Sequence, residues 1–154
     1  MNIIFQIDGG LGKSIMATAM VKVIRKRYKN ANIIVATPFT DVFLNNPYIS
    51  QVYNPNNING FYLKYVQGKD CKIFIEDPYR HSDFILDKPK QLLKTWCELF
   101  GLRYNNEQPE LFLTQPEIDY FAPYYKTDKP ILAIQPNGGP QGLGYQYTWT
   151  RDIP

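Results

Sequence analysis

Residues 5–20, FQIDGGLGKSIMATAM, combine an apolar run, several glycines and a lysine in an order that suits ligand binding. The pattern predicts the end of a strand, a glycine-rich turn and the start of a helix. Backbone N–H groups at such a junction point into one space, where the helix dipole favours negative charge. The junction therefore suits a phosphate or another anionic group, and the remaining question is which one.

The tripeptide Gly-Lys-Ser at 12–14 matches the end of a P-loop, whose backbone N–H groups cradle phosphates and whose lysine neutralises them. The first glycine of that motif should occupy position 7, which is Ile7. The nearest glycines are at positions 9 and 10, so the loop is too short to surround a β-phosphate. A small P-loop NTPase is therefore one alternative, and a tight turn with a solvated Lys13 is another.

A second group of chemically active side chains follows an apolar run that predicts a strand over Cys71–Asp77. In an NTPase, Glu76 or Asp77 at the end of this strand would hold Mg²⁺. In open parallel sheets the carboxyl edge lines the ligand crevice, so Asp77, Arg80 and His81 are candidates to contact a substrate. The alternative for these three residues is an exposed loop without a ligand.

No metal site is expected from the sequence. His81 is the only histidine, and Cys71 and Cys97 do not have the spacing of metal ligands. The two cysteines are instead typical of reduced thiols in a cytosolic protein, and Cys97 is expected to be a buried, inert thiol inside a helix.

Hydrophobic periodicity predicts the elements that must position these residues. The apolar runs Asn2–Ile7 and Asn32–Thr37 are typical of buried strands, and residues 13–29 between them have a helical pattern. A strand, a helix and a strand with short connections form a βαβ unit, which predicts a parallel sheet. The sequence therefore favours an α/β, Rossmann-like fold.

The rest of the chain predicts shorter elements. Residues 87–101 are expected to form a helix that Asp87 caps and Gly101 ends. The other expected elements are a short helix in 41–50, a short strand at 51–54, a polar loop with an aromatic island in 54–70, a short strand or extended segment at 109–114, a helix from 115 and a strand over 131–135.

Composition excludes several classes of protein. With 154 residues, 44% of them hydrophobic and 20% charged, the chain is long and apolar enough for one domain with a core. A formal charge of +3 does not indicate a nucleic-acid partner. No secretory signal pattern and no apolar run of membrane-spanning length is present in the sequence.

The order of these segments resembles the heptosyltransferase-like glycosyltransferases, relatives of ADP-heptose:lipopolysaccharide heptosyltransferase. The likeness begins with the strand, glycine turn, helix and strand in IIFQIDGGLGKSIMATAMVKVIRKRYKNANIIVAT. It continues with DVFLNNPYISQVY, similar to the family's Asn-Pro-Tyr-Ile segment, and with KTWCELFGL and PELFLT. The last pieces, ILAIQPNGG and YTWTRDIP, resemble the start of the family's second domain.

This resemblance implies a GT-B architecture, in which two Rossmann-like domains face a cleft, and it implies that this chain holds the N-terminal half. Residues 1–126 would form the acceptor-side domain, and residues 127–154 a linker and the start of an incomplete donor-binding domain. The expected function is transfer of a sugar from a nucleotide-sugar donor to a glycan or lipopolysaccharide acceptor. The family needs no metal or other cofactor for catalysis.

Glycosyl transfer to a hydroxyl needs a base for the acceptor proton and positive groups for the leaving diphosphate. The family commonly has an acidic residue after the last glycine of the loop, where this chain has Lys13. A lysine replaces a carboxylate base only if its pKa is strongly depressed, so Asp8 is the alternative base, unless it caps the helix.

The resemblance therefore places Asp8 and Lys13 at the catalytic position. The other expected contacts with the acceptor are Gly9, Gly10, Gly12, Asp77, Arg80 and His81. The expected contacts with the donor are Asn137, Gly138, Gly139 and Arg151. Arg151 would take the place of the basic residue that binds the donor phosphate in the family.

Two further expectations concern the chain as a whole. Because it stops where the donor-binding domain would begin, a non-catalytic binding module derived from the transferase domain is another alternative. The basic face of the first helix (Lys22, Arg25, Lys26 and Lys29) is typical of a solvated surface and would also suit anionic lipid headgroups. We expect a cytoplasmic protein, with contact at the inner face of the membrane as a minor hypothesis.

Overall fold

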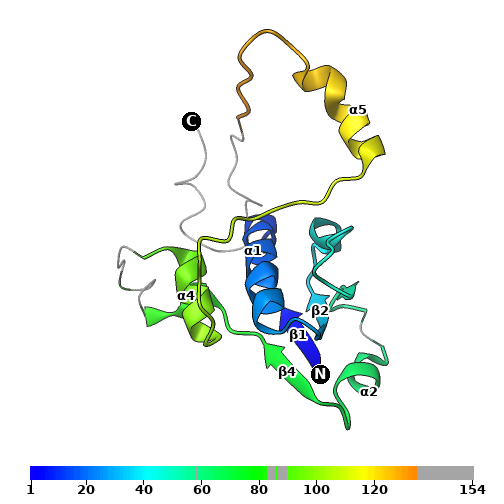
Figure 1. Ribbon diagram of the computed structural model, residues 1–154, viewed down its shortest axis with the longest axis vertical. Helices are drawn as coiled ribbons and strands as arrows, with labels where there is room; N and C mark the ends of the chain where they lie inside the picture. Colours follow the sequence, from blue (N-terminus) through cyan, green and yellow to red (C-terminus); the bar gives the residue numbers. More distant parts are fainter. Residues whose placement is uncertain (58, 83–85, 87–89, 135–154) are drawn as a thin grey trace. The chain divides into compact units, whose positions relative to one another are not determined.

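The computed structural model describes residues 1–57, 59–82, 86 and 90–134 (Figure 1). The chain divides into two units, Met1–Leu113 and Thr114–Pro154. The first unit holds the sheet and the helices packed on it, and the described part of the second holds α5 (Gln115–Tyr125). The assignment of residues 1–126 to an acceptor-side domain and of 127–154 to a donor-binding domain stays a prediction.

The first unit is built on a four-stranded sheet in the order β3-β2-β1-β4. Its strands are all parallel and span Asn2–Gln6 (β1), Asn32–Ala36 (β2), Gln51–Tyr53 (β3) and Cys71–Phe74 (β4). The predicted parallel βαβ unit is confirmed. In β1, Phe5 lies opposite Phe74 of β4, so the chain leaves these two neighbouring strands at the same edge of the sheet.

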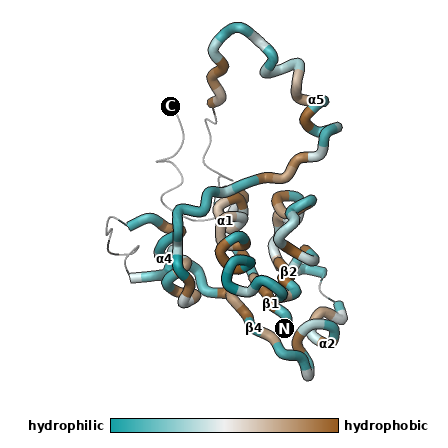
Figure 2. Tube along the Cα trace, in the orientation of Figure 1, coloured by the Kyte–Doolittle hydropathy of each residue, from teal (hydrophilic) through white to brown (hydrophobic). Residues whose placement is uncertain are grey.

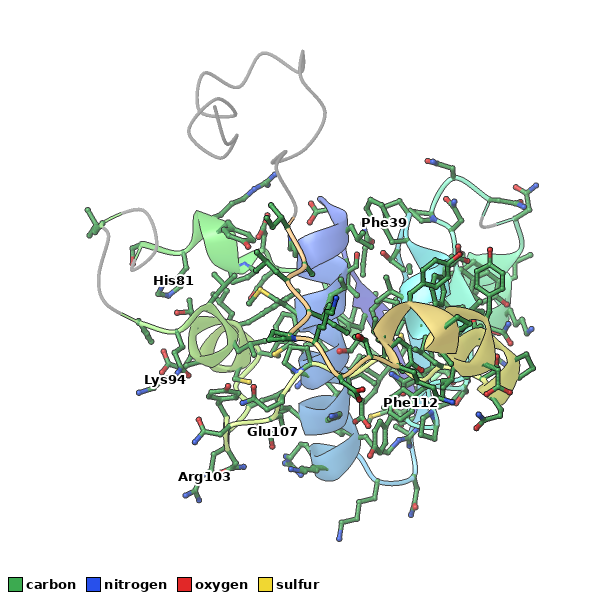
Figure 3. All side chains as sticks on the ribbon, turned by 90° about the horizontal axis from the view of Figure 1, so that it is seen from above. Phe39, His81, Lys94, Arg103, Glu107 and Phe112 are labelled. Atoms are coloured by element: carbon green, nitrogen blue, oxygen red, sulfur yellow. The ribbon has the colours of Figure 1, made fainter. Side chains whose placement is uncertain are left out.

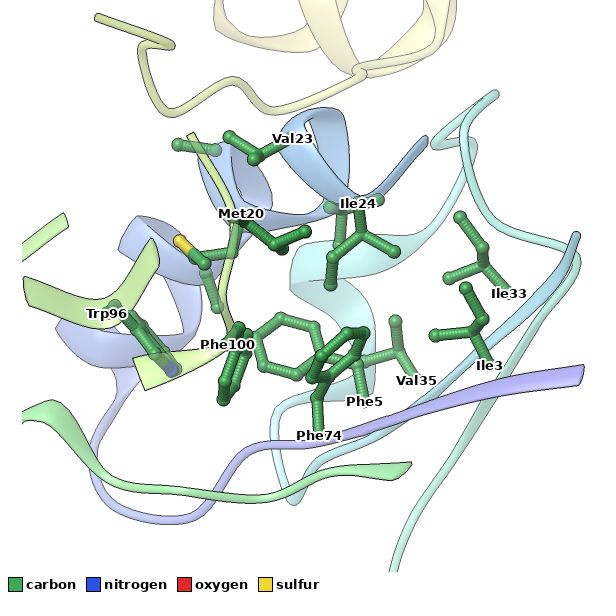
Figure 4. Packing of buried hydrophobic residues seen from close by; sticks show 14 of the residues in the cluster. Ile3, Phe5, Met20, Val23, Ile24, Ile33, Val35, Phe74, Trp96 and Phe100 are labelled. Atoms are coloured by element: carbon green, nitrogen blue, oxygen red, sulfur yellow. The ribbon is translucent and has the colours of Figure 1, made fainter. Parts of the chain in front are cut away.

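One face of the sheet packs against α1 (Leu11–Arg27) and α4 (Leu92–Leu99). Because side chains alternate along a strand, Ile3 and Phe5 of β1 both enter this layer. The Phe5 ring meets Trp96 and Phe100 edge to face, with centroid distances of 5.6 and 5.7 Å (Figure 4). This aromatic cluster holds α4 against the centre of the sheet.

The opposite face of the sheet is covered by a short helix, α2 (Phe61–Tyr65). Its Tyr65 packs against Ile4 and Ile34, which point away from the first layer. The expectation of a polar loop with an aromatic island over 54–70 is corrected in one respect, because the island forms a helix that covers apolar surface of the sheet.

The buried side chains of α1 extend around much of the helix. Met20, Val23 and Ile24 are buried, and so is the polar Thr18. Figure 2 shows hydrophobic and hydrophilic residues mixed along α1. This mixture is consistent with a helix that has the sheet on one side and another segment of the chain on the other.

That other segment is the extended chain at 105–112, which lies along the basic face of α1. Lys22 forms an ion pair with Glu110 at 2.5 Å, and Lys26 forms one at 2.8 Å with Glu107, which is labelled in Figure 3. Glu107 is only 6% exposed. The expectation of a merely solvated basic face is therefore wrong, since two of its lysines hold a neighbouring segment.

Arg25, on the same face, donates from Nε and Nη2 to the carbonyl oxygen of Tyr48 at 3.0 and 2.7 Å. It joins α1 to the loop that precedes β3. Much of the positive charge considered for lipid headgroups thus has a role inside the first unit, and contact with an anionic membrane stays a hypothesis. Among the described residues, no helix is long and apolar enough to span a bilayer.

The ends of α4 partly match the sequence pattern. Gly101 follows the helix with φ +64°, its N–H donates to the Glu98 carbonyl, and the Leu102 N–H donates to the Cys97 carbonyl. This is the hydrogen-bond pattern of a glycine-terminated helix, as predicted. The helix begins at Leu92 with Gln91 as its N-cap, however, and not with Asp87, which lies outside the described residues.

Two other segments differ from expectation. The short helix expected in 41–50 is a 3₁₀ turn, η1 (Thr40–Phe43). Residues 131–134, expected to open a strand with residue 135, have no regular structure, and residue 135 lies outside the described part. A strand requires a neighbouring strand for its hydrogen bonds, and the described part of the second unit contains none. The helix expected from residue 115 is confirmed as α5.

We predict that the two thiols differ sharply in reactivity. Cys97 is fully buried, as expected from the sequence, and burial raises the pKa of its thiol to about 12. Cys71 is partly exposed. An aromatic disulfide reagent at pH 8 should titrate no more than one thiol in the native protein and both in guanidinium. Replacement of Cys71 by Ser should abolish the native signal, and a remaining fast-reacting thiol would contradict the buried position of Cys97.

Candidate functional site

The candidate site lies where the chain leaves β1 and β4. Asp8 follows β1 and Asp77 follows β4, and the parallel register brings these two carboxylates to the same edge of the sheet. The two segments are far apart in the sequence, and the sheet order places them next to each other.

Lys13, in the first turn of α1, bridges these carboxylates. Its Nζ lies 2.5 Å from Asp8 Oδ1 and 3.0 Å from Asp77 Oδ1. The Lys13 side chain is 7% exposed, against 17% for Asp77 and 60% for Asp8. The Nζ also lies 5.9 Å from the ring centroid of Tyr79 and 5.8 Å from that of Trp96, within cation–π range. The interpretation of Lys13 as a solvated residue is therefore wrong.

Asp77 is held in place by its own neighbours. The segment Asp-Pro at 77–78 begins a 3₁₀ turn, η2 (Pro78–Arg80), and Asp77 Oδ1 accepts a hydrogen bond from the Tyr79 N–H at 3.0 Å. Proline suits the first position of such a turn because it has no N–H to satisfy. Arg80 Nε lies 3.9 Å from the other carboxylate oxygen of Asp77.

Asp8 does not cap α1. The N-cap of that helix is Gly10, which has no side chain to accept from the N–H groups of the first turn. Asp8 instead accepts the hydrogen bond from Lys13, which lowers the pKa of the Asp8 carboxyl below its ordinary value. Asp8 is therefore ionised at neutral pH and a weakened base, and its catalytic role stays a prediction.

The glycines of the turn allow this arrangement. Gly9 has φ +87°, a conformation that residues with a Cβ rarely adopt, and a Cβ there would lie 3.3 Å from Lys13 Cδ. Gly10 is extended, and Gly12 is the second residue of α1. The sequence suggested an anion at this junction, and the structure supplies anionic groups from the chain itself, the two aspartates that pair with Lys13.

A cavity of about 550 Å³ opens beside this ion pair. Such a volume suits a small organic ligand. Asp8, Asp77, Arg80 and His81 all line it, so the structure brings together four of the residues selected from the sequence. Figure 3 shows His81 close to η2. The other lining residues are Gln6, Ile75, Glu76, Ser82 and Leu99.

The sequence predicts Glu76 only as a metal ligand and does not predict Gln6, Ile75, Ser82 or Leu99 at the site. Gln6 carries a detectable signal, because it is a polar residue at the end of an apolar strand and follows the Phe5–Phe74 pair, as Ile75 does on β4. Leu99 has no such signal, since it reaches the cavity from α4. Gly9, Gly10, Gly12 and Lys13 are not among the described lining residues, and their contact with a ligand stays a prediction. The predicted donor-side residues Asn137, Gly138, Gly139 and Arg151 lie outside the described part of the chain.

The geometry argues against a nucleotide in a P-loop. Ser14 is fully buried, and its hydroxyl lies 3.2 Å from that of Thr37 at the end of β2. Lys13 is paired with two carboxylates, so neither side chain could meet phosphates without breaking a contact. Among the described residues, no three His, Cys, Asp or Glu side chains gather closely enough to hold a metal ion.

Comparisons with known proteins agree with the fold. No protein-family model and no curated protein sequence matches the chain. A solved structure, the glycosyl transferase family 9 protein from Veillonella parvula DSM 2008, matches with a TM-score of 0.54 and 15% identity over 90% of this chain. The chain has the fold of one half of a family 9 glycosyltransferase. It covers 56% of that protein's length.

Family 9 is the heptosyltransferase family, so the resemblance seen in the sequence and the predicted Rossmann-like half of a GT-B structure are confirmed as a likeness of fold. At this level of identity the likeness establishes the fold alone. The chemistry at the edge of β1 and β4 must therefore be argued from the residues that lie there.

We predict that replacing Lys13 by Met lowers the free energy of unfolding at pH 7 by about 1–3 kcal/mol, because the half-buried Asp77 loses its partner. Asp8 has a lowered pKa in the folded chain, so its contribution is present above about pH 4 and is lost as the pH falls through the folded value. The difference between the two proteins should therefore shrink below about pH 4.

Urea unfolding at pH 7 and pH 3 measures this difference. The matched control is Lys29→Met, because Lys29 is an exposed lysine just beyond the same helix. Equal losses in the two variants, or a Lys13→Met loss that does not change with pH, would contradict the role of the ion pair.

A second prediction separates two glycines of the turn. Gly9→Ala should destabilise the protein by about 1–2 kcal/mol because of its positive φ and the contact with Lys13. Gly12→Ala should be neutral or stabilising by up to about 1 kcal/mol, since alanine favours a helix and nothing lies within 4 Å of the added Cβ. Thermal unfolding followed by circular dichroism compares the two, and the opposite order would exclude the described turn.

Proposed function

We propose that this chain is the acceptor-binding half of a heptosyltransferase-type glycosyltransferase, which transfers a sugar from a nucleotide-sugar donor to a hydroxyl of a glycan or lipopolysaccharide acceptor. One observation carries the proposal: Asp8, Asp77, Arg80 and His81 converge on one cavity at the carboxyl edge of the sheet. The likeness of fold to a family 9 glycosyltransferase supports it.

The composition of the cavity suits a sugar. Carboxylates accept hydrogen bonds from hydroxyl groups, and Asp8, Glu76 and Asp77 supply three of them. Ile75 and Leu99 offer apolar surface against which the C–H face of a sugar ring can lie. Arg80 is 83% exposed at its side chain and can reach a group at the mouth of the cavity.

The acceptor hydroxyl must lose a proton during transfer, and a carboxylate within hydrogen-bond reach would take it. Asp8 remains our candidate for this base. Lys13 stabilises the ionised form of Asp8 and lowers its pKa, so Asp8 is a weaker base than a free aspartate. Lys13 itself acts as a positive charge that positions Asp8 and Asp77 and does not act as the base. The positive groups for the leaving diphosphate would come from the donor side, for which Asn137, Gly138, Gly139 and Arg151 stay predictions.

A binding module without transfer is the second candidate. It is favoured by one observation, namely that the position where the family commonly has an acidic residue carries a lysine whose charge is already paired. Both candidates use the same sugar cavity. Release or transfer of sugar from nucleotide sugars in the presence of glycan acceptor would distinguish the enzyme from the module.

To test the sugar cavity, we predict that Ser82→Trp weakens binding of methyl glycosides at least tenfold. Ser82 lines the cavity and is exposed, so a large ring there should fill space without disturbing the core. Chemical-shift changes in a ¹⁵N-labelled sample, followed during titration, give both the affinity and the affected residues. Lys29→Trp, at an exposed position outside the cavity, is the matched control and should bind as the unmodified protein does.

Shifts that fall away from Asp8, Asp77 and Ser82, or an unchanged affinity in Ser82→Trp, would contradict the proposed site. An NTPase makes a different prediction, because ATP with Mg²⁺ would then bind and Lys13→Ala would abolish that binding. We expect no ATP binding by the unmodified chain.

A further inference from the structure

The charges around the cavity do not balance, and this bears on which sugar can enter it. Three carboxylates line the cavity, from Asp8, Glu76 and Asp77, together with the guanidinium of Arg80, whose Nε lies 3.9 Å from Asp77 Oδ2. Lys13 adds one positive charge from beneath, through its pairs with Asp8 and Asp77. With His81 counted as neutral, one negative charge is therefore left over among the described residues of the site.

That charge belongs to Glu76. Asp8 and Asp77 each have an ion-pair partner within 3.0 Å. The Glu76 carboxylate forms no ion pair or hydrogen bond with any residue that the structure describes. Glu76 is exposed, and it follows Ile75 directly at the end of β4. It is thus a solvated carboxylate at the cavity wall that a ligand can approach.

The helix N-terminus beside the cavity does not make the charge of the site positive. A glycine-rich turn before a helix ordinarily attracts an anion, and Lys13 would ordinarily strengthen that attraction. Here the ammonium group of Lys13 is directed to Asp8 and Asp77, and its side chain is 7% exposed. The positive charge of the junction is therefore used inside the protein and little of it reaches a ligand.

We propose that the cavity selects the acceptor sugar by charge, admitting an uncharged or amino sugar and disfavouring an acidic one, with Glu76 as the specificity-determining residue. This inference rests on the proposed function, because it assumes that a sugar occupies the cavity. An ammonium group on the sugar would pair with Glu76, whereas a carboxylate in the same place would meet it as a like charge.

The test uses three methyl glucosides that differ only at C6, which carries a hydroxyl, an amino group or a carboxylate. Titrations at low ionic strength should give the tightest binding for the amino sugar and the weakest for the acid, with steps of about two- to fivefold, as expected for a partly solvated ion pair. The steps should shrink in 0.5 M salt, because salt screens exposed charges.

Two variants identify the responsible charge. Glu76→Gln keeps the size of the side chain and should make the three affinities equal within about twofold. Asp70→Asn is the matched control. Asp70 is also an exposed carboxylate next to β4, with its side chain 78% exposed, but it precedes the strand and so lies at the end opposite to Glu76. It should leave the order of affinities unchanged.

The possible outcomes are distinguishable. Binding of the acidic sugar as tightly as the neutral one, or an unchanged order in Glu76→Gln, would overturn the charge selection and leave the sugar cavity standing. If none of the three sugars binds the folded protein, the proposed acceptor site itself fails, and the inference with it.

Discussion

The ion pair that Lys13 forms with Asp8 and Asp77 is the interaction on which the candidate site depends. It joins three elements that are distant in the chain: the end of β1, the first turn of α1 and the end of β4. Residues next to each partner hold it in position. Gly9 permits the turn that brings Lys13 back over the strand ends, and the Tyr79 N–H holds the carboxylate of Asp77. Without the lysine, two carboxylates would face each other at the edge of an apolar core.

The scaffold beneath the ion pair keeps those strand ends in register. Phe5 and Phe74 lie opposite each other in neighbouring strands, and Phe100 stacks on Phe74 with a centroid distance of 4.5 Å. Trp96 completes the packing and lies under Lys13 as well, so one aromatic cluster supports both the sheet and the site. On the other side of α1, the pairs of Lys22 and Lys26 with the extended segment hold the helix in position.

These features distinguish two interpretations of the glycine-rich turn, a phosphate-binding loop and a turn beside a substrate cavity. A turn of this kind can hold a phosphate, but here Lys13 is paired with the chain's own carboxylates and the Ser14 hydroxyl contacts that of Thr37. What remains open to a ligand is the adjacent cavity with its carboxylates and apolar wall. Carboxylates accept hydrogen bonds and repel anions, so that arrangement is better suited to hydroxyl groups than to a triphosphate.

The sequence by itself determined the features that depend on local pattern. Apolar runs indicated β1, β2 and β4, helical periodicity indicated α1, and Gly101 marked the end of α4, because these signals arise within a few residues. The placement of Asp8 and Asp77 at one edge followed from the sheet order, in which β1 and β4 are neighbours. Only the tertiary structure decided the direction of the Lys13 side chain, the part that Leu99 takes in the cavity, and the packing of Tyr65 and Glu107. Each of these depends on contacts between residues far apart in the chain. The burial and the charge balance of such contacts cannot be predicted from a local sequence pattern.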